Sequence, residues 1–106
     1  MFSKKSSDDY KAPADGVRLK TVTHGDKTSM VEFFLDAGSA LDEHTHPHEQ
    51  TGYLISGSLT LTIAGQPNPA RPGDSWTIPG DVPHSAEVHE DAHVVEVFYP
   101  VREDLL

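Results

Sequence analysis

Residues 38 to 57, the stretch that decides the fold, read GSALDEHTHPHEQTGYLISG. Three of the seven histidines in the chain fall here within five positions, at 44, 46 and 48. Because side chains of an extended strand alternate between its two faces, His44 and His46 would direct both imidazoles to the same side. Gln50 shares that side if the strand continues past Pro47, which disturbs the alternation. The histidine pair therefore predicts half of a metal site.

The composition limits which metal sites are possible. The chain has 106 residues and no cysteine, and about 100 to 150 residues is the commonest size of a single domain. Disulfides and thiolate-rich zinc sites are excluded, so any metal has to be held by nitrogen and oxygen ligands. We expect one small domain with a modest core.

The charge of the chain limits its partners. The formal net charge is -9, and no basic cluster that could bind a phosphate backbone is present beyond Lys4 and Lys5. No run of about 18 apolar residues is present, and the start, MFSKKSSDDYKAPAD, lacks the apolar block of a signal peptide. We expect a cytoplasmic protein that binds neither nucleic acid nor membrane. An anionic substrate would need a local cation or a metal to overcome the overall charge.

Outside the histidine-rich stretch the pattern predicts strands and no helix. Residues 17–24 and 29–35 are rich in β-branched and aromatic side chains and flank a Gly-Asp turn, so they predict a hairpin. Residues 53–65 predict two strands broken at Gly57, and residues 66–74 predict a loop because three prolines cannot sit in a central strand. Further short strands are predicted at 75–78, 84–89 and 92–99. This pattern indicates an all-β sandwich or small barrel.

The first 15 residues differ in character from the rest. They are polar and predict an N-terminal arm, so a single domain is expected at residues 16–106. An open edge strand on a small barrel favours aggregation unless it is paired. We therefore expect a homodimer in which the arm, or the hairpin at 17–35, joins the sheet of a second copy.

A further candidate ligand lies downstream. His84 follows IPGDVP, residues 78–83, a proline-framed turn that could hold its ring rigidly against the first histidines. Taken alone, HTHPHEQ is also compatible with a polar loop, and His84 with a surface or capping histidine. The remaining histidines at 24, 89 and 93 have no comparable spacing, and we expect them at the surface or packed on strands.

Taken together, these residues resemble the two motifs of the cupin family. The first motif is a glycine, five residues, His-x-His, three or four residues, an acid, six residues and a glycine. It fits Gly38, His44, His46 and Gly57 at every spacing, with Gln50 in place of the acid.

The second motif is a glycine, five residues, proline, one residue, glycine, two residues, histidine, three residues and asparagine. It fits Gly73, Pro79 and His84, while Asp81 replaces the second glycine and Val88 replaces the asparagine. Neither departure touches the histidine. The two motifs occur in the order found in cupins.

The resemblance implies an all-β fold, the cupin double-stranded β-helix, which is a conical jelly-roll barrel with a metal near its open mouth. By position, the ligands of a divalent ion would be His44, His46, Gln50 and His84, whereas His48 falls in the motif's spacer and is expected not to bind. Three imidazoles and an amide are all neutral, so the ion keeps its full charge and should be a strong Lewis acid. Ni, Zn or Mn then fits better than Fe, which oxygenases hold with two histidines and a carboxylate.

The last predicted strand, AHVVEVFY at residues 92–99, contains Glu96 within an apolar run. Alternation places Val94, Glu96 and Phe98 on one face and the intervening residues on the other, and both faces look buried. A buried carboxylate is costly unless it is paired or neutralised, so an interior Glu96 suggests a chemical task. The alternative is an outward Glu96 on an edge strand. Arg102 could pair with Glu96, bind an anion, or be a solvated terminal side chain.

This ending resembles that of the small single-domain pectin-degradation cupins, which help to convert cyclic unsaturated uronates to open-chain keto sugars. The resemblance implies Glu96, Phe98 and Arg102 as catalytic acid, aromatic and arginine, with Glu96 where those proteins have Asp. The implied function is a metal-dependent enzyme that moves a proton on an anionic sugar, an isomerase or lyase in type. A metal-dependent dioxygenase and a non-catalytic sugar-binding or sensor cupin remain the alternatives.

Overall fold

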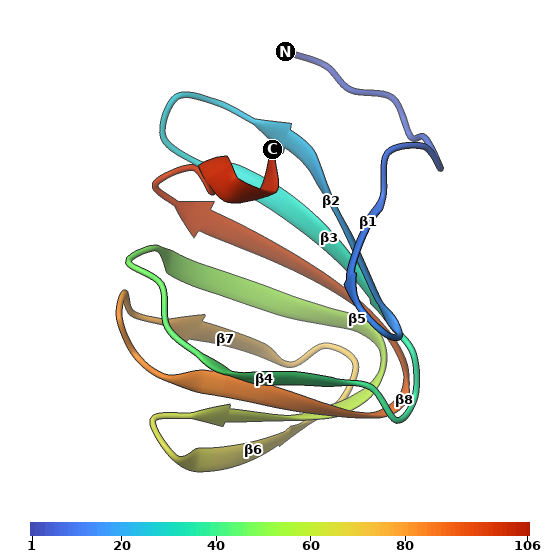
Figure 1. Ribbon diagram of the computed structural model, residues 1–106, viewed down its shortest axis with the longest axis vertical. Coiled ribbons are helices and arrows are strands. Elements are labelled where there is room, and N and C mark those ends of the chain that lie inside the picture. The colour runs from blue at the N-terminus through green and yellow to red at the C-terminus, as the bar shows by residue number, and fades with distance from the viewer.

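A computed structural model describes residues 1–106, and its regular secondary structure is almost entirely β-strand (Figure 1). The strands are β1 (Lys11–Ala14), β2 (Val17–His24), β3 (Ser29–Leu35), β4 (Ala40–His44), β5 (Glu49–Ile63), β6 (Gln66–Ala70), β7 (Ser75–Ile78) and β8 (His84–Tyr99). One 3-10 turn, η1 (Glu103–Leu105), follows near the C-terminus. The structure therefore contains no helix with the length and apolarity that a membrane crossing requires.

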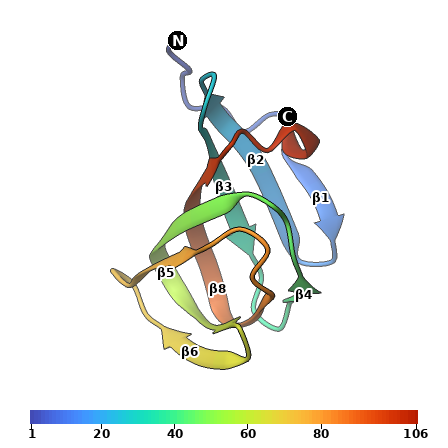
Figure 2. The same ribbon diagram turned by 90° about the vertical axis from the view of Figure 1, so that its left-hand side faces the viewer.

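The two long strands organise the sheet. β5 and β8 pair antiparallel along nearly their whole length, from Glu49 opposite Tyr99 to Ile63 opposite His84. The early part of β5 also pairs with β7 and its late part with β6, while β8 pairs first with β4 and later with β3. The ladder bends in its middle, and the halves face each other around an interior (Figure 2). The predicted all-β jelly-roll architecture is confirmed.

Apolar side chains from both halves fill part of this interior. Alternation along β3, β5 and β8 sends every second residue inward, as the burial pattern of the C-terminal part of β8 shows. The core consists of Val17, Leu19, Val31, Phe33, Leu35, Leu54, Leu59, Leu61, Ala70, Ile78, Ala86, Val88, Ala92, Val94 and Phe98. None of these core residues belongs to the histidine-rich segment at residues 44–50.

Three predicted strands match the structure, whereas the bounds of the two long strands were predicted poorly. The predictions at 17–24, 29–35 and 75–78 match β2, β3 and β7. Residues 53–65 do not form two strands, because β5 continues through Gly57 with β-bulges on either side. Gly57 has φ +89°, and a Cβ there would lie 2.1 Å from the carbonyl oxygen of Asp91. The glycine bends the ladder instead of ending it.

Two further predictions need correction. Residues 84–89 and 92–99 are parts of the single strand β8, which bends at its exposed residues 89–91. Residues 66–70, predicted as loop, form β6. Pro67 and Pro69 are tolerated there because β6 is at the edge of the sheet and pairs only with β5.

The N-terminal arm ends in an edge strand. β1 pairs with β2, with Lys11 opposite Leu19, while residues 1–10 belong to no helix or strand. The hydroxyl of Tyr10 donates a hydrogen bond to Glu32 on β3, and Nε2 of His93 on β8 lies 2.7 Å from the other oxygen of Glu32. Tyr10 thus attaches the arm to the outer face of the sheet.

Candidate metal centre and acid pocket

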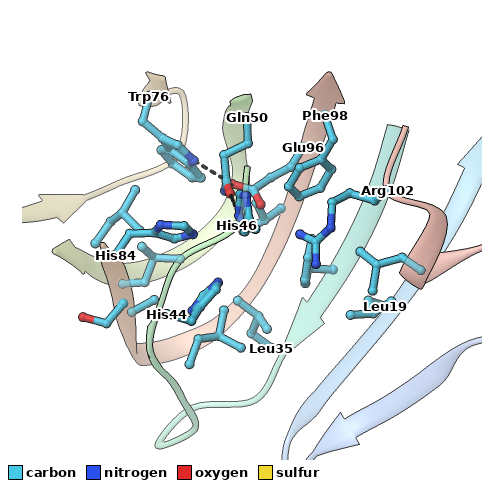
Figure 3. Close-up of a pocket in the computed structure, with 18 residues that line it drawn as sticks. Leu19, Leu35, His44, His46, Gln50, Trp76, His84, Glu96, Phe98 and Arg102 are labelled. Carbon is cyan, nitrogen blue, oxygen red and sulfur yellow. Dashed lines mark hydrogen bonds between the residues drawn. The ribbon is translucent and has the colours of Figure 1, made fainter. Parts of the chain in front are cut away.

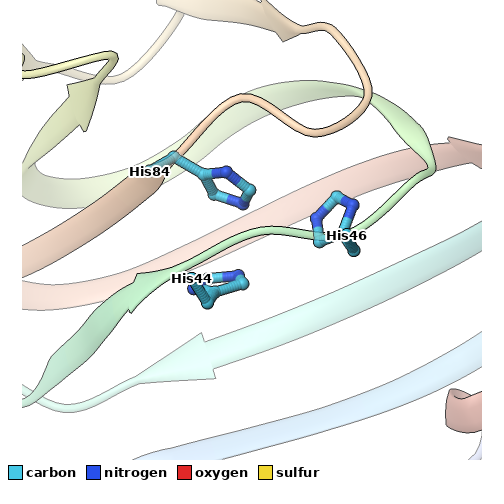
Figure 4. Close-up of side chains that lie close together, drawn as sticks. All are labelled: His44, His46 and His84. Atoms are coloured by element: carbon cyan, nitrogen blue, oxygen red, sulfur yellow. The ribbon is translucent and has the colours of Figure 1, made fainter.

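Three histidines form a cluster at one mouth of the barrel. A ligand nitrogen of each of His44, His46 and His84 lies within 4.8 Å of those of the other two. The imidazoles point toward a common space (Figure 4). Ring centroids are 4.2 Å apart for His44 and His84 and 4.9 Å apart for His46 and His84.

Strand register and one turn bring the two histidine motifs together. His44 on β4 lies directly opposite His84 on β8. The turn before β8 is attached to the segment after β4, because the backbone N–H of Asp81 donates a 2.8 Å hydrogen bond to the carbonyl of His46. Asp81, which replaces the second motif's glycine, has φ +64°, a left-handed conformation that aspartate tolerates better than most residues. At Gly80 a Cβ would lie 2.4 Å from the carbonyl oxygen of Pro47, so only glycine permits this approach.

His44 and His46 do not lie on one continuous strand. β4 ends at His44 and β5 begins at Glu49, so His46 lies in the connection between them. The two imidazoles converge through the course of this connection and not through strand alternation. Pro47 therefore lies in a connection between two strands and not, as expected, in a locally irregular part of one strand.

The hydrogen bonds of the three imidazoles define their tautomers. Each Nδ1 lies near a backbone carbonyl: 2.7 Å from Asp42 for His44, 3.0 Å from His48 for His46, and 2.8 Å from Val82 for His84. A carbonyl oxygen only accepts hydrogen bonds, so each Nδ1 carries the proton. In each neutral ring the lone pair is then on Nε2, which is the arrangement typical of histidines that bind a metal.

The Nε2 atoms fit a cation. Nε2 of His84 is buried and has no hydrogen-bond partner. Nε2 of His46 lies 2.7 Å from Oε1 of Gln50, while Nε2 of the Gln50 amide donates to Glu96. Two acceptor atoms this close repel each other unless a cation lies beside both. The donor set of three imidazoles and one amide oxygen therefore fits a divalent ion.

Burial favours the neutral imidazole at His46 and His84. Desolvation lowers the pKa of His46, and the positive charge of Arg102 acts in the same direction. Desolvation also lowers the pKa of His84, more than its hydrogen bond to the carbonyl of Val82 raises it. Neutral imidazole is the form that binds metals.

Glu96 lies in the interior, beside the histidine cluster. Its exposed fraction is 8%, and its Oε1 accepts hydrogen bonds from Nε1 of Trp76 at 2.7 Å and Nε2 of Gln50 at 2.8 Å. Burial raises the pKa of the Glu96 carboxyl, although both donors and the charge of Arg102 oppose that effect. The opposite face of the same strand is not fully buried as predicted, because Tyr99 is exposed and Val95 and Val97 are half-buried.

Arg102 reaches back over the pocket from beyond the end of β8. Its backbone N–H donates to the hydroxyl of the buried Ser29, and its guanidinium carbon lies 4.9 Å from the centre of the Phe98 ring. Nε and Nη2 donate to Asp104 at 3.0 Å and 2.7 Å. These bonds lower the pKa of Asp104 to about 2. Asp104 occupies only one edge of the guanidinium, so the edge formed by Nη1 and Nη2 is still available for an anion.

All seven candidate residues line one cavity of about 160 Å³ (Figure 3). His44, His46, Gln50, His84, Glu96 and Arg102 contribute most of its polar groups, and Phe98 adds an aromatic wall. The rest of the lining is mostly leucine and other apolar side chains, which exclude water and strengthen electrostatic interactions within the cavity.

The other histidines lie outside this cavity. His24 is exposed, His89 is hydrogen-bonded to Thr60, and His93 stacks on Phe34. His48 is half-buried, and its Nδ1 has no hydrogen-bond partner. Glu49 is exposed.

Sequence reasoning missed two residues that contact the candidate site, Trp76 and Asp104. Trp76 was predicted only as part of a strand, and no contact was predicted for Asp104. No local spacing connects Trp76 to Glu96, because their contact depends on which strands are neighbours. The two-residue separation of Arg102 and Asp104 was the one signal available.

Comparison with known proteins agrees with the fold and the histidine cluster. Residues 31–98 match the family model described as Cupin domain. The chain therefore belongs to the cupin family, and it carries a three-histidine cluster of the kind that holds a divalent metal. A search of curated proteins finds no match.

Among solved structures, the chain is similar to KdgF from Halomonas sp., with 29% identity, full coverage of both chains and a TM-score of 0.92. An RmlC-like cupin from Shewanella frigidimarina NCIMB 400 has 24% identity and a TM-score of 0.92, over 99% of this chain and 95% of that one. Salicylate 1,2-dioxygenase from Pseudoaminobacter salicylatoxidans shares the fold alone, with 17% identity and a TM-score of 0.75, over 81% of this chain and 27% of that one.

Proposed function

We propose that this cupin is a metal-dependent enzyme that moves a proton on a sugar acid, by ketonisation or isomerisation of an unsaturated uronate-like substrate. The observation that carries the proposal is the contact of Gln50 with both His46 and Glu96 inside one cavity. It joins a set of candidate metal ligands directly to an interior carboxyl. The similarity to KdgF supports the same reading.

The metal would be held by Nε2 of His44, His46 and His84 and by Oε1 of Gln50. When bound, a divalent ion supplies Lewis acidity that polarises a carbonyl or enol oxygen of the substrate. Ni, Zn, Mn and Fe are the candidates. The neutral ligand set favours the first three, because no carboxylate reduces the charge of the ion.

The residues of the chain would bind the substrate and move the proton. Glu96 protonates a carbon of the enol, and the carboxylate so formed takes the proton that leaves the enol oxygen, so no proton is gained or lost overall. Arg102 binds the substrate carboxylate through its Nη1 and Nη2 edge, held in place by Asp104. The Phe98 ring supports the guanidinium and keeps water from the carboxyl of Glu96.

The volume of the cavity supports a single small molecule as substrate. About 160 Å³ lies well below the roughly 300 to 1,000 Å³ of pockets that take drug-sized ligands. A monosaccharide acid is compatible with this size, whereas an oligosaccharide would have to extend out of the mouth of the barrel.

The test is a turnover assay with an unsaturated uronate, which loses the ultraviolet absorbance of its conjugated double bond on ketonisation. Purified protein without a histidine tag is first analysed for bound metal and then assayed. Glu96→Gln should reduce turnover strongly, while Glu87→Gln, which changes an exposed acid on the same strand, should not. Equal rates for Glu96→Gln and the unaltered protein would exclude Glu96 as the proton carrier.

A metal-dependent dioxygenase is the second candidate, because the same three-histidine cluster could hold iron and salicylate 1,2-dioxygenase shares the fold. Oxygen uptake distinguishes the two functions. Consumption of oxygen with a candidate substrate would favour the dioxygenase, and uronate turnover at an unchanged rate without oxygen would favour proton transfer.

A further inference from the structure

Three residues form one row across the inner surface of the barrel. Trp76 on β7 lies opposite Gly52 on β5, and Gly52 lies opposite Glu96 on β8. The next row along the strands is formed by Ile78, Gln50 and Phe98. Because side chains of neighbouring strands at paired positions point to the same face, Trp76 and Glu96 face each other across the backbone of Gly52.

Gly52 is what allows the two side chains to meet. A Cβ at this position would lie 2.2 Å from Nε1, 2.3 Å from Cε2 and 2.6 Å from Cζ2 of Trp76. The indole therefore lies directly against the backbone of β5, where any side chain would displace it. From this position its N–H donates the 2.7 Å hydrogen bond to Oε1 of Glu96 (Figure 3).

The two oxygens of Glu96 consequently have different surroundings. Oε1 accepts from both Trp76 and Gln50, whereas Oε2 accepts no hydrogen bond from the protein. Two donors on one oxygen fix the orientation of the carboxyl group. A carboxyl held in this way presents the same oxygen to the cavity in every turnover.

We infer that Gly52 and Trp76 are a positioning pair, which fixes Oε1 of Glu96 and leaves Oε2 as the oxygen that exchanges a proton with the substrate. The catalytic part of this inference rests on the proposed function, in which Glu96 is the proton carrier. The hydrogen bond between Trp76 and Glu96 does not depend on that function. Trp76 acts through Glu96 and is a positioning residue, and Gly52 is required because it leaves room for the indole.

The first test is spectroscopic and independent of activity. Trp76 is the only tryptophan in the chain, so uniformly 15N-labelled, zinc-loaded protein should give one indole N–H signal in a 15N–1H correlation spectrum. The hydrogen bond to Oε1 of Glu96 moves this proton downfield, and Glu96→Gln should shift it because an amide replaces the carboxyl acceptor. The control Glu87→Gln should leave it in place. An indole signal that does not move in Glu96→Gln overturns the inference.

The second test separates positioning from packing. Trp76→Phe keeps an aromatic ring but removes the donor, and we expect kcat to fall about 10- to 100-fold, the usual effect of losing such a supporting partner. KM for the uronate and the metal content should change little. Gly52→Ala should have the same effect because it displaces the indole, and Gly25→Ala, where a Cβ meets nothing within 4 Å, is its control. Full kcat in Trp76→Phe overturns the inference.

The combined variant tests whether the two substitutions act through the same hydrogen bond. If loss of the same hydrogen bond explains both effects, Gly52→Ala should lower kcat little further in the Trp76→Phe background. Where Gly52→Ala fails to fold, as thermal unfolding would reveal, Trp76→Phe and the indole signal decide the matter. If Glu96→Gln kept full turnover while its indole signal shifted, the proposed function would fail and the contact would stand.

Discussion

The side-chain amide of Gln50 donates a 2.8 Å hydrogen bond to Oε1 of Glu96, while its own Oε1 lies 2.7 Å from Nε2 of His46. This relationship accounts for the amide at a position where the first cupin motif has an acid. A glutamate at position 50 would face the carboxyl of Glu96 with no donor between the two. An amide at position 50 therefore supplies the donor that the interior carboxyl of Glu96 needs.

Gln50→Glu should retain the metal and lose activity. Carboxylate oxygen is a good metal ligand, so the metal content should stay at one ion per chain. The two adjacent carboxyl groups cannot both ionise without repulsion, and the donor to Glu96 is lost. We expect turnover to fall about tenfold or more. Elemental analysis and the uronate assay measure the two effects, and loss of the metal in this variant would contradict the assignment.

The double substitution His44→Ala and His84→Ala should abolish metal binding but leave a folded barrel. The core is built of apolar residues that do not include either histidine. Circular dichroism should be preserved, and elemental analysis should find no stoichiometric metal. His24→Ala, at an exposed position outside the cavity, is the matched control. Full metal content in the double variant would show that the ion binds elsewhere.

Arg102→Ala should act on substrate binding more than on turnover. A hydrogen-bonded charge contributes about 1.5–3 kcal/mol, so KM for an acidic sugar should rise at least tenfold. KM for the corresponding neutral sugar should change much less. Asp104→Asn should have a smaller effect in the same direction, because it loosens the guanidinium without removing it. Equal changes for acidic and neutral sugars would refute a role in binding the carboxylate.

The contact of Tyr10 with Glu32 should make stability depend on acid pH. Burial opposes ionisation of Glu32, but hydrogen bonds from Tyr10 and His93 and nearby positive charge outweigh it, so its pKa is lowered below 4.5. The resulting stabilisation is complete above about pH 4.5, the unfolded value, and is lost as pH falls through the lower folded pKa.

Urea unfolding of the unaltered protein and of Tyr10→Phe measures this effect. Loss of one hydrogen bond should lower the free energy of unfolding by about 1 kcal/mol at neutral pH. Because Tyr10 is one of the groups that lower the pKa of Glu32, the difference between the two proteins should shrink on acidification. A difference that is constant between pH 6 and pH 3 would contradict the assignment.

We propose that the protein is a homodimer in which the N-terminal arm or the hairpin of β2 and β3 joins the sheet of a second copy. β1 leaves one edge of the sheet open, and an open edge invites pairing. Sedimentation equilibrium at micromolar concentration should give twice the mass of one chain. A monomer under these conditions would rule the proposal out.

The pattern of neighbouring residues was sufficient to predict three short strands and the candidate metal ligands. The β-branched runs of β2, β3 and β7 gave their bounds, and motif spacing selected His44, His46, Gln50 and His84, which the structure brings to one cavity. The strand breaks predicted at Gly57 and at residues 90–91 are wrong, because the partner strand that continues past each of them is distant in sequence. The row of Trp76, Gly52 and Glu96 was missed for the same reason, since register between strands is a property of the whole sheet.

Strand β8 carries His84 at its first position and Glu96 near its last. Its buried positions are even-numbered from His84 to Val88 and again from Ala92 to Phe98, with the exposed bend at 89–91 between them. Inserting one residue at the bend would turn one half over and point either His84 or Glu96 to solvent, whereas inserting two would restore both. A barrel of this kind can therefore combine a histidine cluster with an interior acid only if any insertion at this bend contains an even number of residues.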